Sequence, residues 1–258
     1  MELTLSMFLI VCPFAFLAGL VDAIGGGGGL ISIPAYLLAG LPAHETIATN
    51  RFSACLGTIT ATIRYCKQHY VDYKLALLGA AMAALGGLTG ANLALMLDEF
   101  VLKIVLIVLL PFLAAYIFLK KDFALKSVQN MSLSKQYAVV LTSTLCIGAY
   151  AGFYGPCSGT FLILVYSSLA KMDILKAEGN AKFVNAATDI CSLIVFLING
   201  FVLLPLGMCA AVFSMAGNYI GSGLVMKNSA KIIRAVILFV LALLFLKIAW
   251  EATAYILK

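Results

Sequence analysis

Five consecutive glycines, Gly25 to Gly29, interrupt the apolar stretch "AGLVDAIGGGGGLISIPAYLLAG" at 18–40. A second interruption, "GFYGPCSG", occupies 152–159. Glycine favours non-helical backbone, and successive N–H groups next to the N-terminus of a following helix form a binding site for anions. Hydrogen bonds to a charged group contribute about 1.5 to 3 kcal/mol each, so about three or four offset the desolvation of a small anion. The two interruptions therefore predict an anion site.

Two later segments, "ATNRFSA" at 48–54 and "EGNAKFVNAATD" at 178–189, can add amide and cationic side chains to this site. Polar groups in such apolar segments face a cavity or another helix rather than lipid. For Arg51 and Lys182, the alternative is that they snorkel to the lipid headgroups. Cys157 either contacts the substrate or fills space. The predicted substrate-binding residues are Gly25, Gly26, Gly27, Gly28, Gly29, Asn50, Arg51, Gly155, Cys157, Ser158, Gly159, Asn180, Lys182 and Asn185.

Asp22 and Asp189 are the acidic residues deepest in apolar segments. A carboxyl group removed from water favours its neutral form, so either residue is a candidate for binding a coupling proton. Alternatively, each neutralises a basic neighbour, which for Asp189 would be Lys182. The spacing of Lys182, Asn185 and Asp189 places all three on one face of a helix.

Membrane-spanning elements must position these residues. Apolar residues make up 63% of the 258 residues and charged residues only 11%, whereas soluble domains have roughly half and a quarter. Apolar segments of spanning or near-spanning length are predicted at 5–24, 46–64, 75–97, 100–119, 136–153, 177–198, 201–226 and 232–256. The cysteines fall mostly within these segments, which favours buried packing over disulfides or metal ligands. We expect an integral membrane protein in contact with the lipid bilayer, with no cofactor, metal or nucleic-acid partner.

Lysine and arginine cluster in only some of the loops, and this asymmetry predicts the orientation. The positive clusters lie at 64–74, 120–135, 171–182 and 227–234. The loops poor in positive charge lie at 41–45, 97–100 and 198–205. The positive ends should face the cytoplasm, so the other loops and both termini should lie on the outer side of the plasma (inner) membrane.

Counting crossings from this orientation gives two halves of opposite sense. Residues 5–40 must start and end outside and 136–170 must start and end inside, so each is a re-entrant hairpin broken at its glycine segment. The segments after the breaks, 30–40 and 160–170, have about half the length needed to cross. We therefore predict an all-α polytopic membrane protein of two inverted-topology repeats, each a broken hairpin followed by three transmembrane helices. The repeats span 1–122 and 135–258, joined by a cytoplasmic linker at 123–134.

The first half also carries a specific motif. The glycine-rich break is followed by an apolar segment containing Pro34 and by Ile47, Ala48, Thr49 and Asn50. This pattern, at 19–50, resembles the sulfite exporter TauE/SafE family, and "GFYGPCSGTFL" in the second half matches it loosely. The resemblance implies a membrane transporter for small anions, typically sulfur oxyanions or organosulfonates such as sulfite, thiosulfate or sulfoacetate.

Three functional classes are compatible with this reading: a secondary anion transporter, a passive anion channel on the same repeats, and an intramembrane hydrolase that uses Ser158. A hydrolase needs a base within reach of the serine hydroxyl, yet His44 and His69 fall in predicted loops on opposite sides of the membrane. We therefore expect a transporter and no enzyme. The sequence leaves open the anion, the direction of transport, the coupling ion and the oligomeric state.

Overall fold

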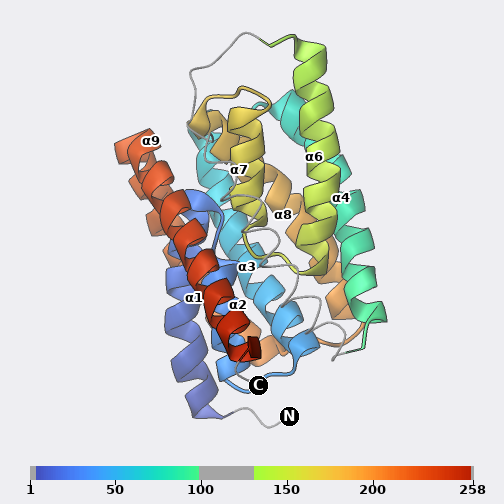
Figure 1. Ribbon diagram of the computed structural model, residues 1–258, viewed down its shortest axis with the longest axis vertical. Helices are drawn as coiled ribbons and strands as arrows, with labels where there is room; N and C mark the ends of the chain where they lie inside the picture. Colours follow the sequence, from blue (N-terminus) through green and yellow to red (C-terminus); the bar gives the residue numbers. More distant parts are fainter. Residues whose placement is uncertain (1–3, 99–130, 257–258) are drawn as a thin grey trace.

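The computed structural model describes residues 4–98 and 131–256, and many of the side chains after Met226 lie outside this description. Its elements are α1 (Leu5–Gly25), α2 (Gly29–Leu38), α3 (Ala43–Lys67), α4 (Tyr73–Met96), α6 (Leu133–Phe153), α7 (Ser158–Ser168), α8 (Ile174–Ile198) and α9 (Leu204–Ile256). The described part is therefore entirely helical and contains no strand, which confirms the all-α prediction (Figure 1).

Within the described ranges, five helical stretches are long and apolar enough to cross a membrane: α1, α4, α6, α8 and the part of α9 from Leu204 to Met226. The predicted span at 46–64 is helical, as α3, but is not among these five. Polar side chains lower its hydropathy, and several of them, such as Thr49, Ser53 and Thr58, are buried among neighbouring helices instead of facing lipid.

Two other predicted segments have different outcomes. The segment at 100–119 lies outside the described residues, as does most of the predicted linker at 123–134. The segment at 232–256 is helical and is assigned together with 201–226 to one element, α9, whose C-terminal part returns to the end of the molecule where the N-terminus lies (Figure 1). The polar stretch before it, "KNSAKIIR" at 227–234, contains no glycine or proline that would end a helix.

The first glycine segment breaks the chain between α1 and α2. α1 ends at Gly25, and Gly26 takes the left-handed conformation with φ of 74°. α2 has only ten residues, about 15 Å of helix or half the thickness of a bilayer core. Val11 of α1 shares an apolar cluster with Tyr36 of α2 and the following Leu41. The chain therefore turns back on itself at the break.

The second glycine segment produces a similar turn. α6 ends at Phe153, Gly155 has φ of 101°, and α7 begins at Ser158 and has eleven residues. The side chain of Gln136, near the start of α6, donates a hydrogen bond to the carbonyl oxygen of Ala170, just after α7, at 2.9 Å. The two hairpins enter the molecule from opposite ends, as Figure 1 shows.

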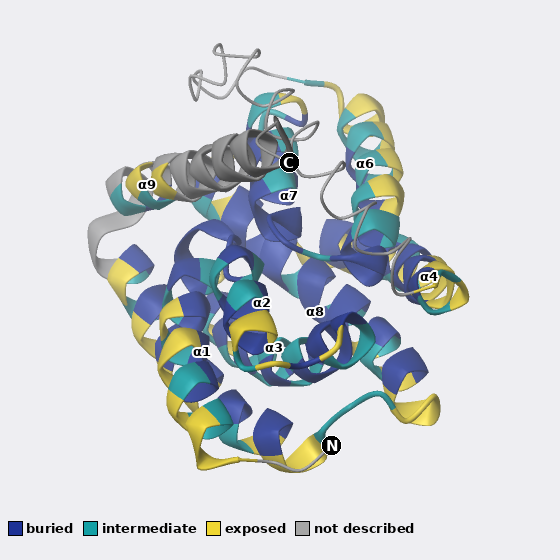
Figure 2. Cartoon of the chain, turned by 60° about the horizontal axis from the view of Figure 1, so that its bottom comes forward, coloured by how far each residue is buried: buried dark blue, intermediate teal, exposed yellow. Residues whose placement is uncertain are grey.

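Helix contacts cross between the two halves of the sequence. α1 packs along α9, and α6 packs along α4. At the centre α3 and α8 contact each other, while α3 also contacts α9 and α8 also contacts α4. Buried residues gather where these central helices meet the short helices, whereas the outer faces of α1, α4 and α6 carry exposed residues (Figure 2). Exposed leucines there, including Leu5, Leu77 and Leu133, suit contact with lipid.

The loops that differ in charge lie at opposite ends of the molecule. At one end, the loop after α3 meets the start of α8, where the backbone N–H of Asp72 donates to Oδ1 of Asn180 at 3.3 Å. At the other end, the rings of His44 and Phe201 lie 5.4 Å apart between centroids. Among the described loops, the lysine-rich ones at 64–74 and 171–182 thus share one end of the molecule, and those poor in positive charge at 41–45 and 198–205 share the other (Figure 1).

Candidate functional site

The two hairpin breaks touch in the middle of the molecule. A Cβ atom built on Gly26 would lie 2.3 Å from the backbone carbon of Gly159, and one on Gly159 would lie 2.7 Å from the Cα atom of Gly26. The hydroxyl of Thr160 donates to the carbonyl oxygen of Gly25 at 2.5 Å. Because backbone meets backbone, no side chain fits between the breaks.

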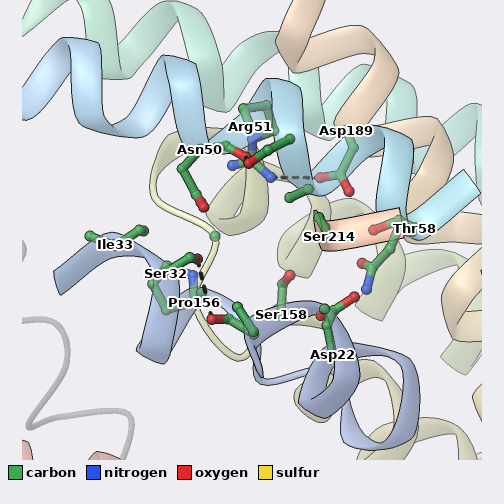
Figure 3. A pocket seen from close by; sticks show the side chains of 18 of the residues that line it. Asp22, Ser32, Ile33, Asn50, Arg51, Thr58, Pro156, Ser158, Asp189 and Ser214 are labelled. Carbon is green, nitrogen blue, oxygen red and sulfur yellow. Dashed lines mark hydrogen bonds and ion pairs between the residues drawn. The ribbon is translucent and has the colours of Figure 1, made fainter. Parts of the chain in front are cut away.

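A cavity of about 50 Å³ opens beside this contact. A single water occupies about 10 to 15 Å³ by the same measure, so the space suits a few waters or one small anion. Arg51 and Asn50 from α3 and Asp189 from α8 lie on one side of it, and Asp22 and Ser158 lie on the other (Figure 3). Its polar and glycine lining consists of Gly19, Asp22, Gly26, Gly28, Gly29, Ser32, Asn50, Arg51, Ser53, Thr58, Tyr154, Gly155, Ser158, Asn185, Asp189, Ser214 and Asn218.

Two helix N-termini reach this cavity. α2 begins at Gly29 and α7 begins at Ser158, and both residues line the space. The first turn of a helix leaves backbone N–H groups without intrahelical partners, and the helix dipole places partial positive charge there. Two such ends converging on one small space favour a negatively charged guest.

The cationic side chain at the cavity is held by an ion pair. Nη1 of Arg51 donates to Oδ1 of Asp189 at 2.7 Å, and Nη2 donates to the carbonyl oxygen of Ala151. Nε of Arg51 is buried without a hydrogen-bond partner. Arg51 is 6% exposed, so it does not snorkel to the headgroups. At least the Nε–H of this guanidinium therefore remains for a ligand.

A second, partly buried ion pair lies behind the cavity. Nζ of Lys182 donates to Oδ2 of Asp22 at 2.8 Å, and Lys182 is fully buried. Asp22 lines the cavity and Lys182 does not. The expected pairing of Asp189 with Lys182 is wrong, since each aspartate pairs across helices. Seven residues along one helix separate Lys182 from Asp189 by a rise of about 10 Å, too far for an ion pair.

These two pairs set the electrostatics of the site. Two cations and two carboxylates cancel, so the four side chains supply no surplus positive charge. An anion placed in this cavity would be held by helix N-termini, by neutral donors and by the unpaired Nε–H of Arg51, or it would displace Asp189 from Arg51.

The predicted site residues divide into two groups. Those that line the cavity are Asp22, Gly26, Gly28, Gly29, Asn50, Arg51, Gly155, Ser158, Asn185 and Asp189. Those that do not are Gly25, Gly27, Cys157, Gly159, Asn180 and Lys182. Within the second group, Gly25 and Gly159 form the contact between breaks, and Cys157 is the buried N-cap residue of α7. Nδ2 of Asn180 donates to the carbonyl oxygen of Lys176 at 2.7 Å, near the start of α8.

Sequence reasoning missed the contribution of α9. Ser214 and Asn218 line the cavity, and they pack so closely against α3 that a Cβ on Gly57 would lie 2.3 Å from Oγ of Ser214. Ser214, Asn218 and Ser222 recur at four-residue spacing within an apolar segment. Polar residues at helical spacing also identified the buried face of α8. The same kind of pattern could have identified the buried face of α9.

Comparisons with known proteins agree with this architecture. The family model described as "Sulfite exporter TauE/SafE" matches residues 11–248. The "Probable membrane transporter protein ORF9" of Sinorhizobium sp is 36% identical, over 96% of this chain and 94% of its own. The "Probable membrane transporter protein YfcA" of Escherichia coli K12 is 33% identical, over 92% of this chain and 88% of its own. A "Probable membrane transporter protein" of Haemophilus influenzae is 28% identical, over 97% and 98%.

No solved structure matches the chain. The family match extends over nearly all of the sequence, and the related proteins are similar in length as well as in sequence. Together with the five candidate spans in the described ranges, this makes the chain an integral membrane protein. It belongs to the sulfite exporter TauE/SafE family, a family of transporters and not of enzymes.

Proposed function

We propose that this protein is a secondary transporter of a small anion, a sulfur oxyanion or organosulfonate such as sulfite, thiosulfate or sulfoacetate. The family name supports the substrate class. The observation that carries the proposal is the convergence of the N-termini of α2 and α7 on one cavity beside Arg51. A site made of N–H groups and a guanidinium suits the oxygen atoms of an oxyanion.

The fold behind this site is two inverted-topology repeats, 1–122 and 135–258, with the linker at 123–134. Contacts at the breaks support this relation. Gly26 contacts Gly159, and an offset of 130 residues between the repeats makes Pro156 the equivalent of Gly26 and Gly29 the equivalent of Gly159. The relation therefore predicts a contact between Pro156 and Gly29. A Cβ on Gly29 would indeed lie 3.0 Å from the Cα atom of Pro156. Inverted repeats commonly place a substrate at the bilayer midplane between broken helices.

The two cationic side chains, Arg51 and Lys182, each contact the opposite repeat. Arg51 of the first repeat reaches the end of α6 in the second, at the carbonyl oxygen of Ala151. Lys182 of the second repeat reaches the end of α1 in the first, at Asp22. The lysine-rich end faces the cytoplasm of the plasma (inner) membrane, so both termini lie on the outer side.

Binding involves competition at Arg51. An arriving oxyanion receives the buried Nε donor and competes with Asp189 for the rest of the guanidinium. A displaced Asp189 would be a buried carboxylate without its counter-ion, which makes it the first candidate for taking up a proton in the occupied state, with Asp22 as the second. Substrate and proton binding are then linked through one ion pair.

Counterflow of radiolabelled thiosulfate, sulfite and sulfoacetate in proteoliposomes tests this function. We expect uptake of at least one of them against its gradient, which a passive anion channel cannot perform. Ser158→Leu projects a large side chain into the cavity and should abolish uptake, whereas Ser168→Leu, on the same helix but away from the cavity, should retain it. Equal activity of the two variants would contradict the site.

A further inference from the structure

One carboxyl group near the site has no partner. Glu178, in the second turn of α8, is 0% exposed, and both of its carboxyl oxygens are buried without a hydrogen bond. By contrast, Asp22 and Asp189 each accept a hydrogen bond from a cation, at 2.8 and 2.7 Å. An ionised carboxylate without hydrogen bonds in an apolar interior is strongly disfavoured, because it loses its hydration without gaining a partner. Neutral Glu178 avoids this cost.

Apolar packing encloses Glu178. Its neighbours in sequence on the buried face of α8, Ala177 and Ala181, belong to a cluster that includes Ala23 of α1 and Tyr65 of α3. The loop before α4 closes this region, since a Cβ on Gly179 would lie 2.5 Å from the carbonyl oxygen of Tyr70. Bulk water is therefore excluded from the carboxyl group in this conformation.

The titratable groups that face Glu178 come from three helices. Lys182 is one turn further along α8, Asp22 faces it from α1, and Tyr65 faces it from α3. The hydroxyl of Tyr65 already donates to the carbonyl oxygen of Ala23 at 2.8 Å. Lys182 is therefore the cation for which Glu178 and Asp22 compete, and in this structure Asp22 holds it.

We propose that Glu178 is a proton-binding site that controls anion binding through Lys182 and Asp22, an inference that rests on the proposed anion transport. When Glu178 carries a proton, Lys182 neutralises Asp22 at the cavity wall. When the proton leaves to solution, the Glu178 carboxylate draws Lys182 away and leaves the charge of Asp22 facing the cavity. That uncompensated negative charge repels an anionic substrate.

This arrangement couples proton and anion binding with a defined sign. The anion binds better when Glu178 is protonated, so by linkage anion binding must promote proton uptake. Raising the pH should weaken anion binding by about 5- to 150-fold, the range typical of coupling between two sites. The coupling proton is then carried on a residue outside the cavity, in addition to any proton at the Asp189 pair.

Infrared spectroscopy of the purified protein tests the protonation state without any substrate. We expect the carbonyl stretch of a neutral, water-excluded carboxyl group in the wild type at neutral pH. The band should be absent in Glu178→Gln, which preserves the shape of the neutral side chain, and should persist in Glu45→Gln, a control at the opposite end of the bundle. Asp22→Asn should also remove it, because Lys182 then pairs with an ionised Glu178. A wild type without the band would overturn the proposal.

Proton uptake on addition of thiosulfate tests the coupling, measured with a pH indicator in weakly buffered detergent solution at an alkaline pH where the infrared band of neutral Glu178 has faded in the substrate-free protein. The wild type and Glu45→Gln should take up a proton, whereas Glu178→Gln should bind thiosulfate with the affinity of the wild type at low pH and without proton uptake. Uptake retained in Glu178→Gln, or wild-type binding without uptake, would overturn the coupling. If the wild type binds no anion in the counterflow screen, the proposed function fails, and the infrared band alone decides the proton site.

Discussion

The two breaks reach similar geometry with different sequences. In the first, made of five glycines, only Gly26 has a positive φ, and the absence of side chains elsewhere serves close approach, as at Gly28, where a Cβ would lie 2.6 Å from the carbonyl oxygen of Ala18. In the second, Gly155 and Cys157 both have a positive φ, Pro156 stiffens the chain, and the hydroxyl of Tyr150 donates to the carbonyl oxygen of Pro156 at 2.7 Å.

This difference assigns unequal mechanical roles to the breaks. Glycine has the greatest backbone freedom, and proline among the least. The backbone of the second break is the more rigid one, and the backbone of the first break adapts to it where Gly26 contacts Gly159. The two breaks differ in sequence where they meet, because complementary surfaces need different residues.

The largest effect is expected at the contact between the breaks. Gly26→Ala forces a side chain into left-handed backbone, at a cost of about 1 to 2 kcal/mol, and drives its Cβ to 2.3 Å from Gly159. Gly29→Ala needs a shift of only a few tenths of an ångström from Pro156. Thermal unfolding in detergent and thiosulfate counterflow should show a severe loss for Gly26→Ala and a mild one for Gly29→Ala. The reverse order would contradict the assignment of Gly26 as the tight contact.

The two ion pairs give the next largest effect and separate stability from binding. Arg51→Gln leaves the buried Asp189 carboxylate unpaired and should cost about 3 to 5 kcal/mol of stability. Lys182→Gln should cost less, because the side chain of Asp22 is 23% exposed. Removing both partners, as in Arg51→Gln with Asp189→Asn or Lys182→Gln with Asp22→Asn, should recover most of the unfolding temperature. Counterflow should recover only in the second double variant, because the proposed site requires Arg51 as a direct ligand of the anion. Recovery in both would remove Arg51 from the site.

The smallest effect distinguishes two asparagines at corresponding positions of the halves. Asn50 lines the cavity, so Asn50→Ala should raise the KM for the transported anion about tenfold, the loss of one hydrogen bond to a charged group. Asn180 bonds the backbone of Lys176 and Asp72 at the end of α8. Asn180→Ala should lower stability by about 1 kcal/mol and leave KM unchanged. Equal changes in KM for the two variants would show that both asparagines contribute equally to anion binding.

Sequence reasoning located the breaks and the short helices well, because glycine clusters and segments too short to cross are local signals. It also placed Arg51 and Lys182 away from lipid as one of two alternatives, but paired Lys182 with the wrong acid. Which carboxylate reaches which cation depends on how α1, α3 and α8 pack, and no local pattern encodes that. The contribution of Ser214 and Asn218 could not be predicted from the glycine clusters, because both residues lie far from them in the sequence and reach the cavity only through the packing of α9.

The importance of Glu178 was also invisible in the sequence. A glutamate near a helix start is ordinarily a solvated residue, and only tertiary packing shows that both of its oxygens are enclosed without a partner. Burial is a property of neighbours distant in the chain, here α1 and the loop before α4.

The crossed packing of α1 on α9 and of α6 on α4 determines which bodies can move. Glycines make these seams tight, since a Cβ on Gly217 would lie 2.1 Å from the carbonyl oxygen of Phe16 and one on Gly90 would lie 2.0 Å from that of Ala149. Each hairpin is thus fastened to a helix that the other half contributes. If the protein changes conformation during transport, we expect each rigid part to combine helices from both halves of the sequence, so that the border between moving parts differs from the border between the halves.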